Sequence, residues 1–134
     1  DGLVEACGGP PTPGIGFALG VERLLLEMNS QGIKVPDQPP PDIYIGAIGE
    51  KAALVCEKLA WQLRMNNIVC IKDIMGRSVK AQMKYADKLG ARYSLILGDT
   101  EIETNKAKLK DMVSGETKDI SLDTLIDRLK KNKG

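Results

Sequence analysis

Histidine is absent from this chain of 134 residues. Imidazole is the side chain used most often as a general base near neutral pH, and it is the commonest metal ligand in proteins. Its absence excludes a mechanism built on an imidazole base and argues against a zinc site. The sequence therefore predicts no metal centre.

Cysteine is scarce as well. Cys7, Cys56 and Cys70 are odd in number and widely spaced, and they include no Cys-x-x-Cys pair. This spacing provides neither a zinc-ligand pattern nor a disulfide framework. We expect all three to be buried or half-buried apolar residues in a reducing compartment.

Long apolar runs are also missing. No stretch of the sequence approaches the roughly 20 apolar residues that cross a bilayer as a helix. The first residues lack the basic region and apolar core of a signal peptide. We therefore expect a cytoplasmic protein with no membrane partner.

The acidic residues form no pair that indicates general acid–base catalysis. We expect Asp99, Glu101 and Glu103 to lie in a solvated turn and strand edge. Asp123 and Asp127 are expected on the outer side of the last helix. Since no nucleophile and base stand together, the second half of the chain is predicted to bind a ligand without chemistry of its own.

Charge is distributed unevenly along the chain. Residues 1–41 contain two Lys or Arg against five Asp or Glu, whereas residues 42–134 contain 17 against 13. The second part is therefore mildly basic. This excess suits contact with a polyanion at one place and is too small for indiscriminate nucleic-acid binding.

Prolines predict a boundary between two regions. The stretch from Pro36 to Pro41 cannot continue a helix or a central strand, because proline fixes the backbone angle φ and lacks an N–H group. We predict an extended linker over residues 30–41. It separates the remnant of one domain, residues 1–29, from a complete domain, residues 42–134.

The second region alternates between strand and helix patterns. Short apolar runs bounded by turn residues predict buried strands, and helical spacing of apolar residues predicts the helices between them. Such crossover connections give an at least partly parallel sheet, to which a polar hairpin adds an antiparallel edge. The predicted strands are residues 43–48, 68–71, 91–97, 106–112 and 116–120, and the predicted helices are residues 50–65, 77–89 and a last one from Ser121.

The predicted helix over residues 50–65 carries apolar side chains on two faces. One face, with Ala52 and Leu63, is expected to lie on the sheet. A neighbouring face carries Leu54, Trp61 and Met65. We therefore expect this helix to be buried on more than one side.

Glycines near the start of the chain indicate the edge of a nucleotide site. Gly14, Gly16 and Gly20 are separated by apolar residues, which describes a strand whose backbone something else approaches closely. A helix predicted over residues 21–28 follows and carries Arg23. An arginine in the first turns of a helix, beside exposed strand backbone, can hold phosphate charge.

The common phosphate-binding motifs do not match this glycine run. A dinucleotide fingerprint requires glycine where Leu19 stands, and a Walker loop requires lysine and a hydroxyl residue where Val21 and Glu22 stand. A tight packing point between a strand and a helix explains the glycines as well. Arg23 taken alone is also typical of a solvated helix residue.

The predicted helix over residues 77–89 has a basic face and an apolar face. The apolar face is expected to pack on the sheet, and the basic face can either meet nucleic acid or remain solvated. The basic residues are Arg77, Lys80, Lys84 and Lys88, and the apolar residues are Val79, Met83 and Ala86.

Neighbouring residues favour recognition of bases or phosphates. Gly76 precedes the helix, and Ser78 and Gln82 add directional donors and acceptors. Tyr44 or Tyr85 can stack on an unpaired base. The alternative for both tyrosines is a half-buried packing role.

Four segments carry a family resemblance. Residues 1–4 and 8–24 closely resemble motif 3, the last catalytic motif of the histidyl-tRNA synthetases, which are class II enzymes. Residues 76–87 look like the signature segment of that family's anticodon-binding domain, and residues 93–98 match the strand that follows. The resemblance implies an α/β fold with a mixed, mostly parallel sheet of about five strands flanked by three helices. A strand–helix remnant of the class II catalytic domain precedes it.

The resemblance also implies an activity. The family activates histidine with ATP and magnesium and transfers it to its tRNA, tRNA(His), as a homodimer. Arg23 matches the arginine that binds an ATP phosphate, and Gly14, Gly16 and Gly20 match the glycines that shape the floor of that site. Adenylate formation depends on positive charge at the phosphates more than on a side-chain base.

Contact with tRNA is expected from the second domain. The basic stripe supplies charge, and the residues before it lie nearby in the predicted fold. The expected anticodon-binding residues are Arg77, Lys80 and Lys84, with Tyr44, Asp73 and Met75 close to them.

The other motifs of the family are missing from these residues, and Asp1–Leu3 resemble the trailing end of one of them. We therefore expect the chain alone to be inactive and to hold no cofactor. The alternative is a non-catalytic, synthetase-like module that regulates another enzyme or senses tRNA. Intact Gly16 and Arg23 favour an active parent.

Overall fold

The computed structural model describes residues 1–35 and 37–131. The chain forms two compact units, residues 1–38 and 39–134. The division falls inside the proline-rich stretch. Pro36, in the predicted linker, and residues 132–134, at the end of the predicted second domain, lie outside the described residues.

The described residues of the first unit contain two helices, α1 (Leu3–Ala6) and α2 (Val21–Ser30). Helix α2 begins where the sequence predicts it, and Gly32 follows with a left-handed φ of 71°. The strand predicted over the glycine run is wrong for this unit, because residues 10–20 form no strand in the described chain. A strand requires a neighbour that accepts and donates its backbone hydrogen bonds, and the unit offers none.

None of the described residues of the first unit is buried. Phe17 is 98% exposed and Leu26 is 69% exposed. Cys7 is also exposed, so its predicted burial is wrong. The helices of this unit therefore have no hydrophobic core of their own to pack against.

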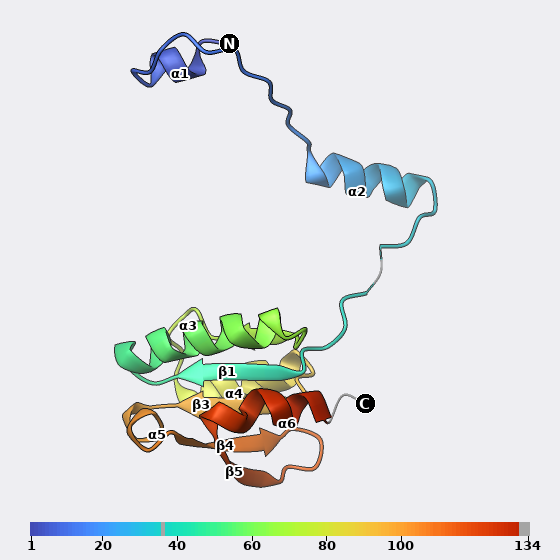
Figure 1. Ribbon diagram of the computed structural model, residues 1–134. Coiled ribbons are helices and arrows are strands. Elements are labelled where there is room, and N and C mark those ends of the chain that lie inside the picture. Colours follow the sequence, from blue (N-terminus) through green and yellow to red (C-terminus); the bar gives the residue numbers. More distant parts are fainter. Residues whose placement is uncertain (36, 132–134) are drawn as a thin grey trace. The chain divides into compact units, whose positions relative to one another are not determined.

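The second unit is built on the predicted five-stranded mixed sheet, with strand order β2-β1-β3-β4-β5. Figure 1 labels β1, β3, β4 and β5 of this sheet. Strand β1 pairs in parallel with β2 and β3, whereas β4 pairs antiparallel with β3 and β5. The strands are β1 (Ile43–Ala47), β2 (Cys70–Lys72), β3 (Tyr93–Leu97), β4 (Lys106–Asp111) and β5 (Thr117–Ser121).

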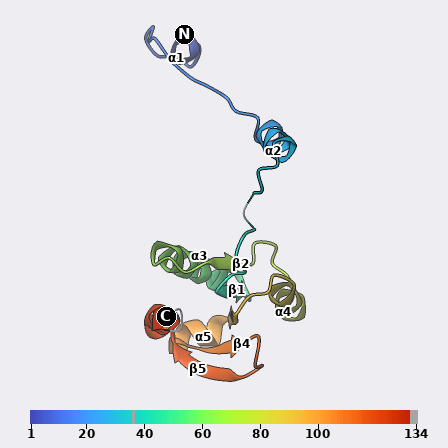
Figure 2. The same cartoon turned by 90° about the vertical axis from the view of Figure 1, so that its right-hand side faces the viewer.

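Helices cover the sheet on both sides of β1. Helices α3 (Glu50–Met65) and α4 (Val79–Lys88) lie on opposite faces (Figure 2). The core on the α3 face also takes in α6 (Leu125–Lys131), which follows a 3-10 turn over Leu122–Thr124. The three predicted long helices are therefore present.

Helix α5 (Asp99–Thr104) of the second unit was not predicted, and neither was the short helix α1 of the first unit. Helix α5 occupies the segment that was expected to be a turn and strand edge. Its six residues are too few to show a helical period. The Glu101 carboxylate accepts a hydrogen bond from the Gly98 N–H group at 2.9 Å, which satisfies a free donor at the helix start.

Each face of the sheet packs into its own hydrophobic core. Ile43 and Ile45 of β1 point into the larger core with α3, and Tyr44 points into the smaller core under α4. Cys56 and Cys70 are buried in the larger core, as predicted. Burial raises the pKa of the Cys56 thiol to about 11 and that of Cys70 to about 12.

Helix α3 is buried on one side only. Leu54, Trp61 and Met65 are 75%, 61% and 65% exposed, so the prediction of burial on a second side is wrong for this chain. The sheet supplies a single surface to the helix, and the opposite face therefore remains open.

The two faces of α3 allow a matched test of core packing. Leu63→Ala removes a fully buried side chain and is expected to lower the free energy of unfolding by about 2–5 kcal/mol. Leu54→Ala makes the same change at an exposed position and is expected to alter it by less than about 0.5 kcal/mol. Urea unfolding followed by circular dichroism measures both; equal losses would contradict the assigned core.

Candidate nucleic-acid interface

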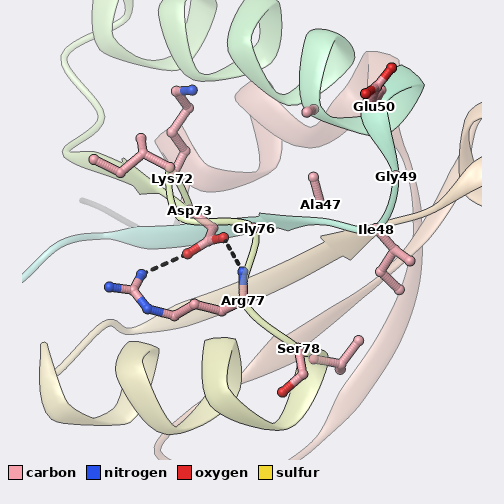
Figure 3. A pocket seen from close by; sticks show the side chains of 12 residues that line it. Ala47, Ile48, Gly49, Glu50, Lys72, Asp73, Gly76, Arg77 and Ser78 are labelled. Atoms are coloured by element: carbon pink, nitrogen blue, oxygen red, sulfur yellow. Dashed lines mark hydrogen bonds and ion pairs between the residues drawn. The ribbon is translucent and has the colours of Figure 1, made fainter.

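A pocket of about 680 Å³ opens at the carboxyl ends of β1 and β2 (Figure 3). The chain leaves β1 for α3 on one face and leaves β2 for α4 on the other. Ligands of open α/β sheets bind at such a divergence. The end of β1, the start of α3 and the loop between β2 and α4 line the pocket.

Arg77 is held in place at this pocket by Asp73. Its guanidinium Nη1 donates to Asp73 Oδ1 at 2.7 Å, and its backbone N–H donates to Asp73 Oδ2 at 2.9 Å. The guanidinium carbon also lies 4.4 Å from the ring centroid of Tyr85. The Arg77 side chain is 32% exposed, so a positioned cation faces solvent.

The Asp73 carboxylate remains charged at neutral pH. Its side chain is only 3% exposed, and burial raises its pKa. Hydrogen bonds from the backbone and guanidinium of Arg77 outweigh burial and bring the pKa below its usual value. The negative charge that fixes Arg77 is thus maintained by Arg77 itself.

Tyr44 contacts the pair of Asp73 and Arg77 from the interior of the protein. It is fully buried, its hydroxyl donates to Asp73 Oδ1 at 3.3 Å, and its ring meets that of Tyr85 edge to face at 6.1 Å. Burial and the neighbouring Asp73 raise the pKa of Tyr44 to about 12. The predicted stacking of Tyr44 on a base is wrong for this structure, because no part of the side chain reaches solvent.

Gln82 joins two walls of the pocket. Its Nε2 donates to the Ala47 carbonyl at 2.9 Å and to the Arg77 carbonyl at 2.6 Å. A side chain at Gly46 would collide with Gln82 Oε1, so only glycine allows this approach. Gln82 is fully buried; its expected contact with a ligand is therefore wrong, and the side chain positions the Arg77 loop instead.

The helix starts later than predicted. Helix α4 begins at Val79, so Arg77 belongs to the loop and is not part of a helical stripe with Lys80 and Lys84. Those two lysines are exposed and do not line the pocket. Val79 was expected to face the sheet and is 42% exposed.

The loop before Arg77 presents apolar side chains. Ile74 lines the pocket and is 77% exposed, and the neighbouring Met75 is 68% exposed. Lys72, which sequence reasoning missed, also lines the pocket and pairs with Glu57 of α3. Its position at the carboxyl end of a strand, directly after the predicted strand over residues 68–71, was the one signal that could have identified it.

The expected ATP-binding residues lie in the first unit. Gly14, Gly16, Gly20 and Arg23 are all exposed, and the Gly14 N–H donates to Asp1 Oδ1 at 2.9 Å. A Cβ atom at Gly14 or Gly16 would meet nothing within 4 Å, whereas one at Gly20 would lie 3.7 Å from Arg23. Packing within the unit therefore does not account for the first two glycines.

Residues 1–35 and 37–131 contain no group of three or more His, Cys, Asp or Glu residues that could hold a metal ion. No helix in the same ranges is long and apolar enough to cross a membrane.

Known proteins resemble this chain along nearly its whole length. It is 65% identical over 97% of its length to the histidine–tRNA ligase of Acetivibrio thermocellus and 50% identical over 92% to that of Clostridium perfringens. The crystal structure of apo histidyl-tRNA synthetase from S. aureus matches 96% of the chain with a TM-score of 0.67 and 43% identity. The predicted resemblance and α/β fold are confirmed.

These relatives are much longer than the chain, which spans 31%, 30% and 33% of their respective lengths. Residues 42–132 match the family described as Anticodon binding domain. That match includes β1 through α6 and all residues that line the pocket beside Arg77. The chain therefore belongs to the anticodon-binding domain family.

Proposed function

We propose that the second unit binds the anticodon loop of tRNA(His) as part of a histidine–tRNA ligase. The observation that carries this proposal is the Arg77 guanidinium, ordered by Asp73 and partly exposed beside the pocket. The relatives named above support the choice of tRNA.

The pocket has the components that single-stranded RNA requires. Proteins recognise unpaired bases by hydrogen bonds to their edges and by contact with their flat faces. A guanidinium group that is already oriented loses little conformational entropy when it forms such hydrogen bonds. Ile48 and Ile74, 51% and 77% exposed, offer apolar contact to a base in the same pocket.

The first unit is proposed to belong to the ATP site of the same enzyme. ATP, bound with Mg²⁺, would supply the adenylyl group that activates the histidine carboxylate, and pyrophosphate would leave. Arg23 would neutralise phosphate charge there, and the backbone at Gly14 and Gly16 is open enough for close approach.

Burial of the first unit is part of this proposal. Its exposed apolar side chains are proposed to pack against other parts of a ligase about three times as long as this chain. A homodimeric assembly and a cytoplasmic location are proposed from the family resemblance alone.

Replacing Arg77 tests base recognition. Arg77→Met is expected to weaken binding of a synthetic tRNA(His) anticodon hairpin by about 1–3 kcal/mol and to reduce its preference over a hairpin with substituted anticodon bases. Arg77→Lys keeps the charge but not the fork, and is expected to lose the preference as well. Fluorescence anisotropy at one fixed salt concentration measures both effects.

Arg128→Met provides the matched control, since it removes one exposed arginine from α6 outside the pocket. It is expected to leave the preference unchanged. Equal binding of the native and substituted hairpins by the unaltered chain would reject anticodon recognition, and equal losses in the Arg77 and Arg128 variants would reject the role of Arg77.

Catalysis by these 134 residues alone is expected to be absent. Because the chain spans about a third of its relatives, we expect no histidine-dependent exchange of pyrophosphate into ATP above the background without enzyme. Exchange above that background, lost in an Arg23→Ala variant, would show that the chain forms the adenylate unaided.

A further inference from the structure

A row of lysines lies on the sheet face opposite the larger core. Along β4, Lys106, Lys108 and Lys110 alternate with Ala107 and Leu109. Ala107 and Leu109 are buried in the core on the α3 face. Because side chains alternate across a strand, the three lysines share the other face, which is the face that α4 covers at β1.

Helix α4 leaves this part of the sheet uncovered. In Figure 2, α4 lies beside β1. On that side of the sheet, no helix of the described chain extends over β4 and β5. A groove of about 270 Å³ occupies this face. It runs beside Met83 of α4 and over Ile96 of β3, and Lys108 and Lys110 line its other side.

The charge of the row is largely uncompensated. In residues 1–35 and 37–131, none of the three lysines has a carboxylate oxygen within 4.0 Å of its nitrogen. Two acids are near. Asp119 of β5 is the register partner of Lys108, and Glu101 lines the groove with one oxygen bonded to the Gly98 N–H group.

The groove adjoins the pocket beside Arg77. Ile48, at the end of β1, lines both cavities. A ligand that enters the pocket can therefore continue across Ile48 toward Lys108 and Lys110. Alternate residues of a strand lie about 6.8 Å apart, which is comparable to the spacing of successive phosphates in a nucleic-acid strand.

We propose that the lysine row of β4 binds the phosphate backbone of the same RNA strand whose base occupies the pocket beside Arg77. This inference rests on the function proposed above and adds a second surface to it. Phosphate contacts place a strand in register and carry no sequence information. The row would therefore supply affinity, while the pocket supplies selectivity.

A triple variant, K106A/K108A/K110A, tests the row. Binding of the tRNA(His) anticodon hairpin to the full chain is measured by anisotropy at a series of salt concentrations. Each phosphate contact to a single strand contributes about 0.7 to the slope of log affinity against log salt. We expect the slope to fall by about 2, with an equal fold-loss for native and base-substituted hairpins.

The control triple, K51A/K58A/K130A, removes the same charge from α3 and α6, which pack on the opposite face. It is expected to lower the slope by less than about 0.5. If both triples lower the slope equally, the β4 row is a solvated surface and the inference is wrong, although anticodon binding would stand. If the unaltered chain does not bind the hairpin at all, the proposed function itself fails.

Removing a negative charge beside the lysine row is expected to have the opposite effect on hairpin binding. Asp119→Asn removes the acid that faces Lys108 and is expected to strengthen hairpin binding about twofold to fivefold, a size typical of exposed charge pairs. Asp127→Asn on α6 is the control and is expected to have no effect. Weaker or unchanged binding by Asp119→Asn would contradict the inference, and this single change tests it even if the triple variant does not fold.

Discussion

Burial of β1 on both faces is the constraint on which the second unit depends. Ile43 and Ile45 fill one core and Tyr44 fills the other, and Gly46 permits α4 to approach the strand closely. A strand in this position needs a helix on each side, so the connections that follow β1 and β2 must diverge. The pocket beside Arg77 is the space that this divergence leaves.

Buried polar groups give that pocket a defined shape. Asp73 uses both carboxylate oxygens to hold Arg77, and Tyr44 and Gln82 bind the same loop from within the smaller core. The lysines on the exposed sheet face form no ion pair with any residue that the structure describes, so their side chains are less constrained than Arg77. The domain therefore presents a rigid cation next to flexible ones, which is the arrangement that the two proposals, base recognition at Arg77 and phosphate binding along β4, require.

Sequence patterns were sufficient for the sheet and its long helices, because apolar runs and helical spacing reflect the two cores directly. They failed where tertiary partners decide the outcome. Arg77 continues the spacing of a helical stripe, yet its hydrogen bonds to Asp73 keep it in the loop. Tyr44 and Gln82 have the chemistry of RNA-binding residues, and only the packing of α4 on β1 shows that they are buried. The glycine-run strand lacked a partner strand, which no local pattern records.

The three cysteines differ in a way that has a practical consequence. Cys56 and Cys70 lie in the core with raised pKa values, whereas Cys7 is exposed in the first unit. Only the thiolate form reacts with common alkylating dyes. The native sequence thus carries one accessible attachment point for a fluorophore, located in one unit, while the single tryptophan, Trp61, is exposed in the other. Energy transfer between them would measure the distance from Cys7 to Trp61 in solution without any engineered residue.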